Sequence, residues 1–212
     1  MYIRRFGIKL ERLKEDQIET VRQWRNAQEI RSFMEFQEYI SPEMQRNWFL
    51  TLDRLRDFYF VIELLNEPVG LIHASSIDWF KKTGSAGLFI WKKEVLGSHV
   101  PVLASLSMVD FFFGFCTLEN LYAKVMSNNS VAISYNSQLG FKLSEEADHK
   151  PLLHYLLKKE DYYKSTAQLH EMAELVGGKQ HEVVIESDLL NELEQLGVIS
   201  SKHSEVHITT VK

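Results

Sequence analysis

Apolar and polar positions follow two different periods along this chain, and the two periods predict alternating strands and helices. Residues 2–13 alternate in the manner of a β-strand, whereas residues 15–26 gather their apolar side chains on one side of an amphipathic helix. Ser41 followed by Pro42 is typical of a helix N-cap and a first-turn proline. We therefore expect a second helix as far as residue 52.

The middle of the chain carries the strongest strand signals. Residues 58–65 and 69–80 are rich in aromatic and β-branched residues and are separated by Asn-Glu-Pro, a turn-forming sequence, which predicts an antiparallel hairpin. The other elements expected up to residue 163 are a strand at 86–91, a buried helix at 101–117, a strand at 120–126, a helix at 129–140 ended by Gly140, and strands at 141–147 and 152–163.

The character of the sequence changes after residue 164. The elements expected there are a helix at 166–176, a strand at 182–187, a capped helix at 188–197 and a loose tail at 200–212. We therefore interpret the chain as a main domain of residues 1–164 and a C-terminal appendage of residues 165–212. The appendage would dock on the main domain or join two copies into a homodimer. The order of elements predicts an α/β (α+β) fold with helices flanking a central sheet.

Composition and charge argue against several classes of function. The 212 residues carry a net charge of −5, whereas nucleic-acid binding needs a concentrated excess of Lys and Arg, so no nucleic-acid partner is expected. No signal-peptide pattern opens the chain and polar residues interrupt the longest apolar run, residues 100–116, so neither secretion nor membrane spanning is expected. The single Cys116 in that run is interpreted as a buried structural thiol in a reducing cytoplasm.

One loop, Leu96 to Val100, has the setting of a pyrophosphate site, because it lies between a strand and a buried helix and contains a glycine. An ordinary turn is the alternative. A second strand and helix, residues 120–140, would bring another loop to the carboxyl ends of neighbouring parallel strands, where open α/β sheets bind ligands. In that helix Asn136 can face the cleft, and Asn129 either faces the cleft or caps the helix.

Motifs in the chain resemble those of a known family. Residues 125–141, VMSNNSVAISYNSQLGF, resemble the end of the acyl-CoA-binding core of GNAT N-acetyltransferases, where a Val, an Asn, an Ala-Ile pair and a Leu-Gly-Phe recur at this spacing. The upstream segment VRQWRNAQEIRSFMEFQEYISPEMQRNWF resembles the branch that acetylates amino-sugar nucleotides, as in the pseudaminic acid pathway, and its ribosomal-protein-acetylating relatives. VGLIHASSIDW and AGLFIW are similar to the family's central strands, and the likeness covers residues 4–160.

The resemblance implies a mixed sheet that splays between the strands at 86–91 and 120–126, with acetyl-CoA in the gap. It also implies transfer of the acetyl group to an amine of a small molecule, an amino sugar on a nucleotide carrier. The residues implied to bind acetyl-CoA are Phe89, Ile90, Trp91, Leu96, Gly97, Ser98, His99, Val100, Asn129 and Asn136. Those implied to lie near the amine substrate are Trp24, Arg25, Met34, Trp48 and Asp78, with a place in the core as the alternative for the tryptophans.

The chain departs from the family pattern at two places. Glu94 and His99 stand where the pyrophosphate loop usually has a basic or Gln residue and a small residue, so cofactor binding is expected to be weaker unless His99 donates to a phosphate. Many members have a Tyr four residues before the Gly of Gly-Phe, and it protonates the departing thiolate. Here that residue is Asn136. Tyr135, about 100° away around the helix, is the candidate for this acid.

A general base must take the proton of the incoming ammonium group, and His73 and Asp78 are the candidates. An imidazole has an ordinary pKa of about 6.5, although a surface histidine bound to structure is the alternative. Asp78 otherwise binds a substrate hydroxyl or amine, or starts a turn. The remaining histidines show no metal-ligand spacing, so no metal is expected. Two rival hypotheses stay open: a GNAT fold that has lost acyl transfer and acts as a binding module, and protein N-terminal acetylation.

Overall fold

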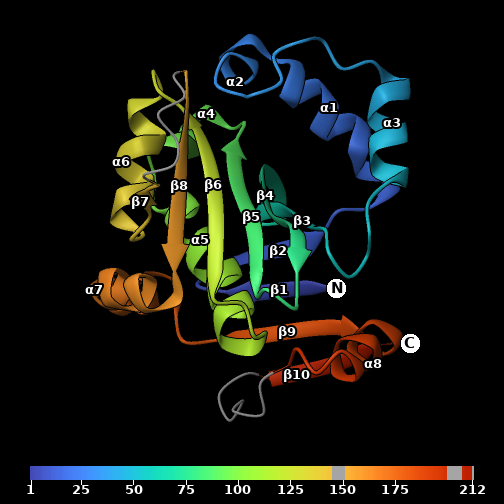
Figure 1. The fold of residues 1–212 in the computed structure, drawn as a ribbon, viewed down its shortest axis with the longest axis vertical. Coiled ribbons are helices and arrows are strands. Elements are labelled where there is room, and N and C mark those ends of the chain that lie inside the picture. Colours follow the sequence, from blue (N-terminus) through green and yellow to red (C-terminus); the bar gives the residue numbers. More distant parts are fainter. Residues whose placement is uncertain (145–150, 200–206, 212) are drawn as a thin grey trace.

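The computed structural model describes residues 1–144, 151–199 and 207–211 (Figure 1). The strands are β1 (Tyr2–Arg5), β2 (Ile8–Arg12), β3 (Phe58–Leu64), β4 (Glu67–Asp78), β5 (Thr83–Ile90), β6 (Asn120–Met126), β7 (Lys142–Leu143), β8 (Leu152–Lys158), β9 (His181–Glu186) and β10 (His207–Val211). Within the described residues they form one mixed sheet in the order β10-β9-β1-β2-β3-β4-β5-β6-β8-β7.

The helical elements are η1 (Glu15–Gln17), α1 (Ile18–Asn26), α2 (Gln28–Arg31), α3 (Pro42–Leu50), α4 (Lys93–Leu96), α5 (Val100–Asp110), η2 (Phe111–Phe115), α6 (Ser130–Gln138), α7 (Lys159–Gly177) and α8 (Ser187–Gln195).

Alternation along the central strands gives the sheet two apolar faces. Phe58 and Phe60 of β3 point into the main core, which also contains the buried side chains of α5. Val61 points instead into a smaller cluster with residues of α1 and α3, and Tyr59 packs against that cluster. His73 is the cross-strand partner of Tyr59 and shares its face. Figure 1 shows α1, α2 and α3 grouped on one side of the molecule, while α6 lies beside β7 and β8.

β5 and β6 are parallel neighbours that pair only where both strands begin. The Cα partners are Thr83 with Asn120, Gly84 with Leu121, and Ser85 with Tyr122. Beyond this pairing β5 continues to Ile90 and β6 to Met126 without partners between them. The splay expected between these two strands is thereby confirmed, and it leaves a wedge at their carboxyl ends.

The N-terminal segment differs from the single strand expected over 2–13. It folds back as an antiparallel hairpin, because Phe6 and Gly7 adopt φ angles of 52° and 77° and reverse the chain. The helix start at Ser41 is confirmed, since its Oγ accepts a hydrogen bond from Met44 N at 3.1 Å. The antiparallel hairpin of β3 and β4 is also confirmed.

Two expected elements end early. The buried helix expected over 101–117 is α-helical only to Asp110 and continues as the π-helical turn η2. The strand expected over 152–163 ends at Lys158, and α7 begins at Lys159. Two acidic residues in the first turn of α7 interact favourably with its dipole, and Tyr162 is buried on its inner side. From Lys159 onward the buried side chains therefore recur with the spacing of a helix and not with the alternation of a strand.

The C-terminal segment extends the same sheet. The boundary expected after residue 164 falls inside α7, β9 pairs antiparallel with β1, and β10 pairs parallel with β9. Residues 207–211 form a strand, although a loose tail was expected there. Residues 145–147 of an expected strand and residues 200–206 of the expected tail lie outside the described residues.

Cys116 is buried, as expected of a structural thiol. Its backbone forms an isolated β-bridge with Ile199 of the C-terminal segment. Burial raises the pKa of its thiol, so the sulfur stays protonated and unreactive. Among the helices described, none combines the length and apolar composition that crossing a membrane requires.

Candidate active site

A cavity of about 460 Å³ opens between the beginning of α5 and the outer side of α6. Its lining carries hydroxyl and amide groups and no charged side chain. The lining residues are Leu96, Gly97, Ser98, Pro101, Val102, Ser130, Val131, Ser134, Tyr135 and Gln138. This lining fits the phosphate groups of acetyl-CoA, because it offers hydrogen-bond donors and no carboxylate that would repel them.

The loop expected to cradle a pyrophosphate is the short helix α4 followed by Gly97. Gly97 has a φ of −98°, and a Cβ added there would meet nothing within 4 Å, so neither strain nor space demands glycine. Ser98 Oγ accepts a hydrogen bond from Val100 N at 3.2 Å. Pro101 has no N–H, so Val102 carries the first N–H of α5 without a partner among the described residues. One backbone donor therefore remains for an anion.

Glu94 and His99, the two departures from the family pattern, flank this loop without lining the cavity. Both are exposed, and His99 forms no capping hydrogen bond with α5. Glu94 therefore contributes no carboxylate to the lining of the cavity.

Helix α6 uses its two asparagines differently. Asn129 Oδ1 accepts a hydrogen bond from Ala132 N at 3.0 Å, so Asn129 caps the helix. Asn136 is 9% exposed and lies on the inner side. Gly140 ends the segment with a φ of 94°, as expected, and a Cβ there would lie 2.9 Å from Asp161 O.

Tyr135 ties α6 to α5. Its hydroxyl donates to Pro101 O at 2.7 Å and lies 2.6 Å from Ser105 Oγ, which is therefore the donor of the second bond. Burial raises the pKa of this phenol, so it is protonated at neutral pH. The phenol proton of Tyr135 is thus engaged in the hydrogen bond to Pro101 O, and its transfer to a thiolate would break that hydrogen bond.

The end of β5 presents unpaired backbone to the wedge. β5 pairs with β4 as far as Ile90 but with β6 only as far as Ser85. Alternate backbone groups between these residues therefore have no strand partner on the β6 side. Phe89 and Ile90 lie in this stretch, where the resemblance places a pantetheine arm. Trp91 is bonded differently, since its backbone and indole N–H groups both donate to carbonyls of β4.

His73 lies on the α1–α3 face of the sheet, beside the wedge strand β5. Its ring stacks on Tyr59 with centroids 4.8 Å apart, and its Nδ1 lies 3.1 Å from Ser75 Oγ. A Cβ on Gly87 would lie 2.4 Å from His73 Nε2, so the imidazole reaches across β5 only because residue 87 is glycine. Burial lowers the pKa of His73 to about 4, which keeps the ring neutral at pH 7.

Two tryptophans that were predicted to contact the substrate lie on the same face of the sheet as His73. Trp48 of α3 meets Tyr59 edge to face, with centroids 4.9 Å apart. Trp24 of α1 is 40% exposed and stacks in parallel on Trp91, with centroids 6.3 Å apart. The tryptophans therefore pack against the sheet and still leave part of an indole face open.

The chain after α1 connects both strands of the wedge. Lys93, which follows β5, lies 3.3 Å from Glu29 of α2, and Lys124 of β6 lies 2.9 Å from Glu35. Met34 is half-buried in this connecting segment. Arg25 donates to a carbonyl of the same segment, burial lowers its pKa, and its Nη1 is buried without a hydrogen-bond partner among the described residues. These contacts place α2 and the residues after it at the open end of the wedge.

Asp78 lies apart from His73. Its Cα partner is Thr83, at the end of the sheet where β5 and β6 are still paired. Five residues of extended strand separate it from His73 by roughly 16 Å. Its Oδ1 accepts a hydrogen bond from Lys81 N at 2.9 Å, which lowers the pKa of the carboxyl. Asp78 thus adopts the alternative role of starting a turn.

Sequence reasoning missed Tyr59, Ser75 and Gly87, although all three surround His73. Strand register is the signal for two of them, since Tyr59 and Gly87 are the cross-strand partners of His73. Strand alternation is the signal for Ser75, two residues along the same face. The cavity residues missed are Pro101, Val102, Ser130, Val131, Ser134 and Gln138. In the described part of the chain, no three His, Cys, Asp or Glu side chains group as metal ligands.

Comparisons with known proteins relate this geometry to a family. A family model described as "Acetyltransferase (GNAT) domain" matches residues 8–142. FdhC, a nucleotide-linked sugar GNAT solved without ligand, has a TM-score of 0.66 and 17% identity over 80% of this chain and 97% of its own. RimL, a ribosomal L7/L12 alpha-N-protein acetyltransferase solved with coenzyme A, has a TM-score of 0.60 and 14% identity over 72% of this chain and 94% of its own.

A third similar structure is a chimera of the Vibrio cholerae spermidine N-acetyltransferase SpeG and hSSAT. Its TM-score is 0.62 and its identity 17%, over 74% of this chain and 98% of its own. At identities this low the structural likeness shows the fold alone. A search of curated protein sequences finds no match.

Proposed function

Because this chain belongs to the acetyltransferase (GNAT) family, we propose that it transfers an acetyl group from acetyl-CoA to the primary amine of a small molecule, an amino sugar on a nucleotide carrier. The observation that carries the proposal is the short pairing of β5 with β6, which stops at Ser85 and leaves a wedge. The uncharged cavity between α5 and α6 supports it, since it provides room and donors for phosphate groups.

Acetyl-CoA would be held chiefly by backbone and hydroxyl groups. The backbone of Phe89 and Ile90 would bond the pantetheine arm, and the N–H of Val102 with the hydroxyls of Ser130 and Ser134 would face the phosphates. The bound co-substrate supplies the activated acyl group. Positioning by these groups accounts for much of the rate, because a thioester and an amine react readily once aligned.

His73 would accept the proton that the amine loses. A C–N bond forms between the amine nitrogen and the acetyl carbon, the C–S bond breaks, and the thiolate is released. The neutral imidazole, with a pKa of about 4, is too weak a base for a free ammonium ion. We assign it the proton released as nitrogen attacks, when that nitrogen becomes more acidic. Water in the wedge would protonate the thiolate, since Pro101 holds the proton of Tyr135.

The acceptor would lie on the α1–α3 face between the aromatic rings and His73. Trp48 and Tyr59 would cover one side of a sugar, and Trp24 offers a partly exposed indole that suits a base or a sugar. Arg25 would lie at the same entrance. One similar structure is described as a nucleotide-linked sugar GNAT, which agrees with this acceptor class, while two others are described as acetyltransferases of a ribosomal protein and of spermidine. Asp78 has no part in this proposal.

Thermal unfolding tests the proposal directly. Acetyl-CoA at 100 times its Kd stabilises a protein that binds it by about 2.7 kcal/mol, so the melting temperature should rise by several degrees. A panel of amino-sugar nucleotides, incubated with acetyl-CoA and followed by mass gain and free-thiol release, then identifies the acceptor. Absence of any thermal shift at millimolar acetyl-CoA contradicts the proposal. Turnover of peptides with no turnover of nucleotide sugars would indicate protein N-terminal acetylation instead.

A binding module without acyl transfer is the second candidate, and one feature of α7 favours it. Met172, Leu175 and Val176 form an apolar stripe that is 61%, 87% and 60% exposed, which suits contact with another molecule. This candidate predicts a folded, associating protein that does not respond to acetyl-CoA. A homodimer that also binds acetyl-CoA would support the enzyme and assign the stripe to dimer formation.

A further inference from the structure

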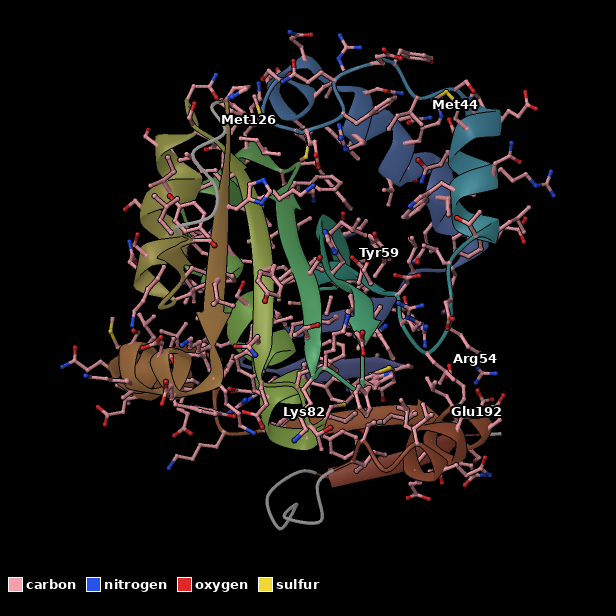
Figure 2. The ribbon with its side chains drawn as sticks, in the orientation of Figure 1. Met44, Arg54, Tyr59, Lys82, Met126 and Glu192 are labelled. Carbon is pink, nitrogen blue, oxygen red and sulfur yellow. The ribbon has the colours of Figure 1, made fainter. Side chains whose placement is uncertain are left out.

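The side chains of His73, Tyr59, Ser75 and Asp57 share the α1–α3 face of the sheet. Tyr59 is the Cα partner of His73, and Ser75 follows His73 by two residues on the same strand. Asp57 directly precedes β3, and the register of β3 and β4 places it opposite Ser75. Figure 2 shows Tyr59 on the side of the sheet that is turned toward α1 and α3. Three polar side chains therefore lie on the same face as the imidazole that is assigned as the base.

The two ring nitrogens of His73 point to different neighbours. Nδ1 lies 3.1 Å from Ser75 Oγ, on the same strand. Nε2 reaches over Gly87 of β5, where it lies 2.4 Å from the position that a Cβ would take, and it has no hydrogen-bond partner among the described residues. The ring is half-buried, so part of it remains open on its own face. Nε2 is therefore the nitrogen that can meet the acceptor amine.

A neutral imidazole carries one proton, and the place of that proton decides whether Nε2 can act as a base. If Ser75 Oγ accepts a hydrogen bond from Nδ1–H, Nε2 keeps a free lone pair at the wedge. If the Ser75 hydroxyl donates to Nδ1 instead, Nε2 carries the proton and cannot accept one from an amine. The second arrangement would also leave an N–H group beside β5 without an acceptor, which costs free energy.

The position of Asp57 favours the first arrangement. Its Oδ1 accepts a hydrogen bond from Ser76 N at 2.8 Å and its Oδ2 accepts one from Asp53 N at 3.0 Å, so the carboxylate is fixed beside Ser75. Asp57 lies on the β3 side of β4, whereas Nε2 points to β5 on the other side. A negative charge attracts an N–H group and repels a lone pair, so it favours the proton on the nearer nitrogen, Nδ1. Burial lowers the pKa of His73, and the charge of Asp57 partly opposes that shift.

The hydroxyl of Ser75 has a second neighbour in Tyr59. Burial raises the pKa of Tyr59, and a hydrogen bond with the Ser75 hydroxyl partly opposes that rise. A serine hydroxyl has one hydrogen and two lone pairs. When this hydrogen is directed to the phenol oxygen, a lone pair of Ser75 Oγ remains for Nδ1–H. Ser75 is only 6% exposed, so little water competes for these bonds.

We propose that Ser75 is a positioning residue for the reaction, whose Oγ accepts the Nδ1 proton of His73 and thereby holds the unprotonated Nε2 at the wedge. When the amine attacks, its proton passes to Nε2, and the bond from Nδ1–H to Ser75 remains while the ring carries a positive charge. The carboxylate of Asp57 stabilises that charge. Ser75 acts through the imidazole and not on the acceptor. The inference rests on the proposed function in one respect, that His73 accepts the amine proton.

Nitrogen-15 spectra of the histidine rings in the full chain, recorded at pH 7, test the inference without any substrate. The protonated and unprotonated nitrogens of a neutral imidazole give clearly different signals. The His73 signals, identified by their loss in His73→Gln, should show a protonated Nδ1 and an unprotonated Nε2. In Ser75→Ala the ratio of the two tautomers should change about fivefold toward Nε2–H, which is the effect of one typical hydrogen bond.

Steady-state kinetics give a second readout. Ser75→Ala should lower kcat at least about threefold and leave both KM values within about twofold, because the hydroxyl acts on the base and not on binding. Ser75→Thr keeps a hydroxyl and should retain the tautomer and most of kcat. Ser107→Ala is the matched control, since it removes a buried hydroxyl of α5 that donates to Leu103 O, and it should change neither the tautomer nor kcat.

Three results would overturn the inference. They are a proton on Nε2 in the unchanged protein, the same tautomer in Ser75→Ala, and a changed tautomer in Ser75→Ala with unchanged kcat. The last would show that the reaction does not use the nitrogen that Ser75 controls. If no amine is acetylated, a tautomer that depends on Ser75 still upholds the bond between Ser75 and His73, and the proposed function alone fails.

Discussion

The imidazole of His73 reaches across Gly87 of the neighbouring strand, with its Nε2 2.4 Å from the position that a Cβ of residue 87 would occupy. Real Cβ atoms do not approach that closely, so the ring has this place only because the side chain opposite is a hydrogen atom. Gly87 lies on β5 beyond the residues that pair with β6. The pair therefore brings a neutral nitrogen base to the edge of the wedge.

Gly87→Ala should displace the imidazole and lower kcat at least tenfold while leaving the Kd for acetyl-CoA nearly unchanged. The added methyl group clashes with His73 and not with the cavity between α5 and α6. Gly114→Ala is the control, because its Cβ would meet only the Tyr163 hydroxyl, at 3.3 Å, far from the wedge. Steady-state kinetics with calorimetry measure both effects. Full activity in Gly87→Ala would remove His73 from the mechanism.

Stability should fall in mild acid because of His73. Burial lowers its pKa from about 6.5 to about 4, so the unfolded chain binds a proton more readily than the folded one. The contribution of His73 is therefore fully present above pH 6.5 and is lost as the pH falls through 4. At pH 4.5 the loss should reach roughly 2 kcal/mol. Urea unfolding of the protein and of His73→Gln, at pH 7 and 4.5, measures it.

His181 is a second buried histidine that must be considered in that comparison. Burial, and then the nearby Arg5, lower the pKa of His181 to about 4, so this residue contributes an acid-dependent loss of its own. His73→Gln should therefore reduce the acid sensitivity and not abolish it. Equal acid sensitivity in the variant and the unchanged protein would show that the imidazole of His73 titrates normally in the fold.

The hairpin of β3 and β4 and the start of α3 follow from local signals in the sequence, whereas the splay of the sheet was expected from the family resemblance alone. Each of these local signals specifies one element independently of the rest of the chain. The signals are the alternation of apolar residues in a strand, the Ser-Pro sequence at a helix start and the glycine at a helix end. The turn at Phe6 was missed because a phenylalanine rarely adopts a φ of 52°, so nothing local interrupts the apparent strand. The strand expected through residue 163 was likewise too long, since the helical period of α7 becomes visible only over several turns.

The candidate site was less predictable than the fold, because the roles of its side chains depend on how the helices and strands pack and not on residue type alone. Ser130, Ser134 and Gln138 form the cavity wall on α6 and follow one another at intervals of one helical turn. This spacing is visible in the sequence, but the sequence-based prediction of the cofactor site considered only the two asparagines of the helix. The bond of Tyr135 to Pro101 depends on how α5 packs on α6, and no pattern in one helix reveals it. The low pKa of His73 similarly needs the tertiary burial that only the folded chain supplies.

Asp110→Asn should destabilise the protein by about 3 kcal/mol. This buried carboxylate is held by Arg5, Tyr162 and His170, and its loss leaves two cationic groups without a counter-charge. His170 donates to Thr166 O and to Asp110, at 2.8 and 2.9 Å, so both ring nitrogens carry protons. Chemical unfolding at pH 7 measures the effect.

The same network has a definite pH dependence. Burial opposes protonation of His170, but the hydrogen bond to Asp110 more than offsets it and the pKa is raised. The stabilisation is therefore complete below about pH 6.5 and is lost as the pH rises through the raised pKa. Asp161→Asn, which breaks the exposed pair with Lys142, is the control and should cost less than about 1 kcal/mol. Equal losses in the two variants would contradict the role assigned to the network.

Val131→Asp should weaken acetyl-CoA binding about tenfold without unfolding the protein. Val131 lines the cavity between α5 and α6 and is 71% exposed, so a carboxylate there stays hydrated and faces the phosphate groups. Val131→Asn has nearly the same shape without the charge and should bind almost normally. The difference between the two variants should shrink as salt is raised from 0.05 to about 0.5 M, since screening shortens the reach of the added charge. Calorimetric titration at both salt concentrations measures it, and equal binding by the two variants would place the phosphates elsewhere.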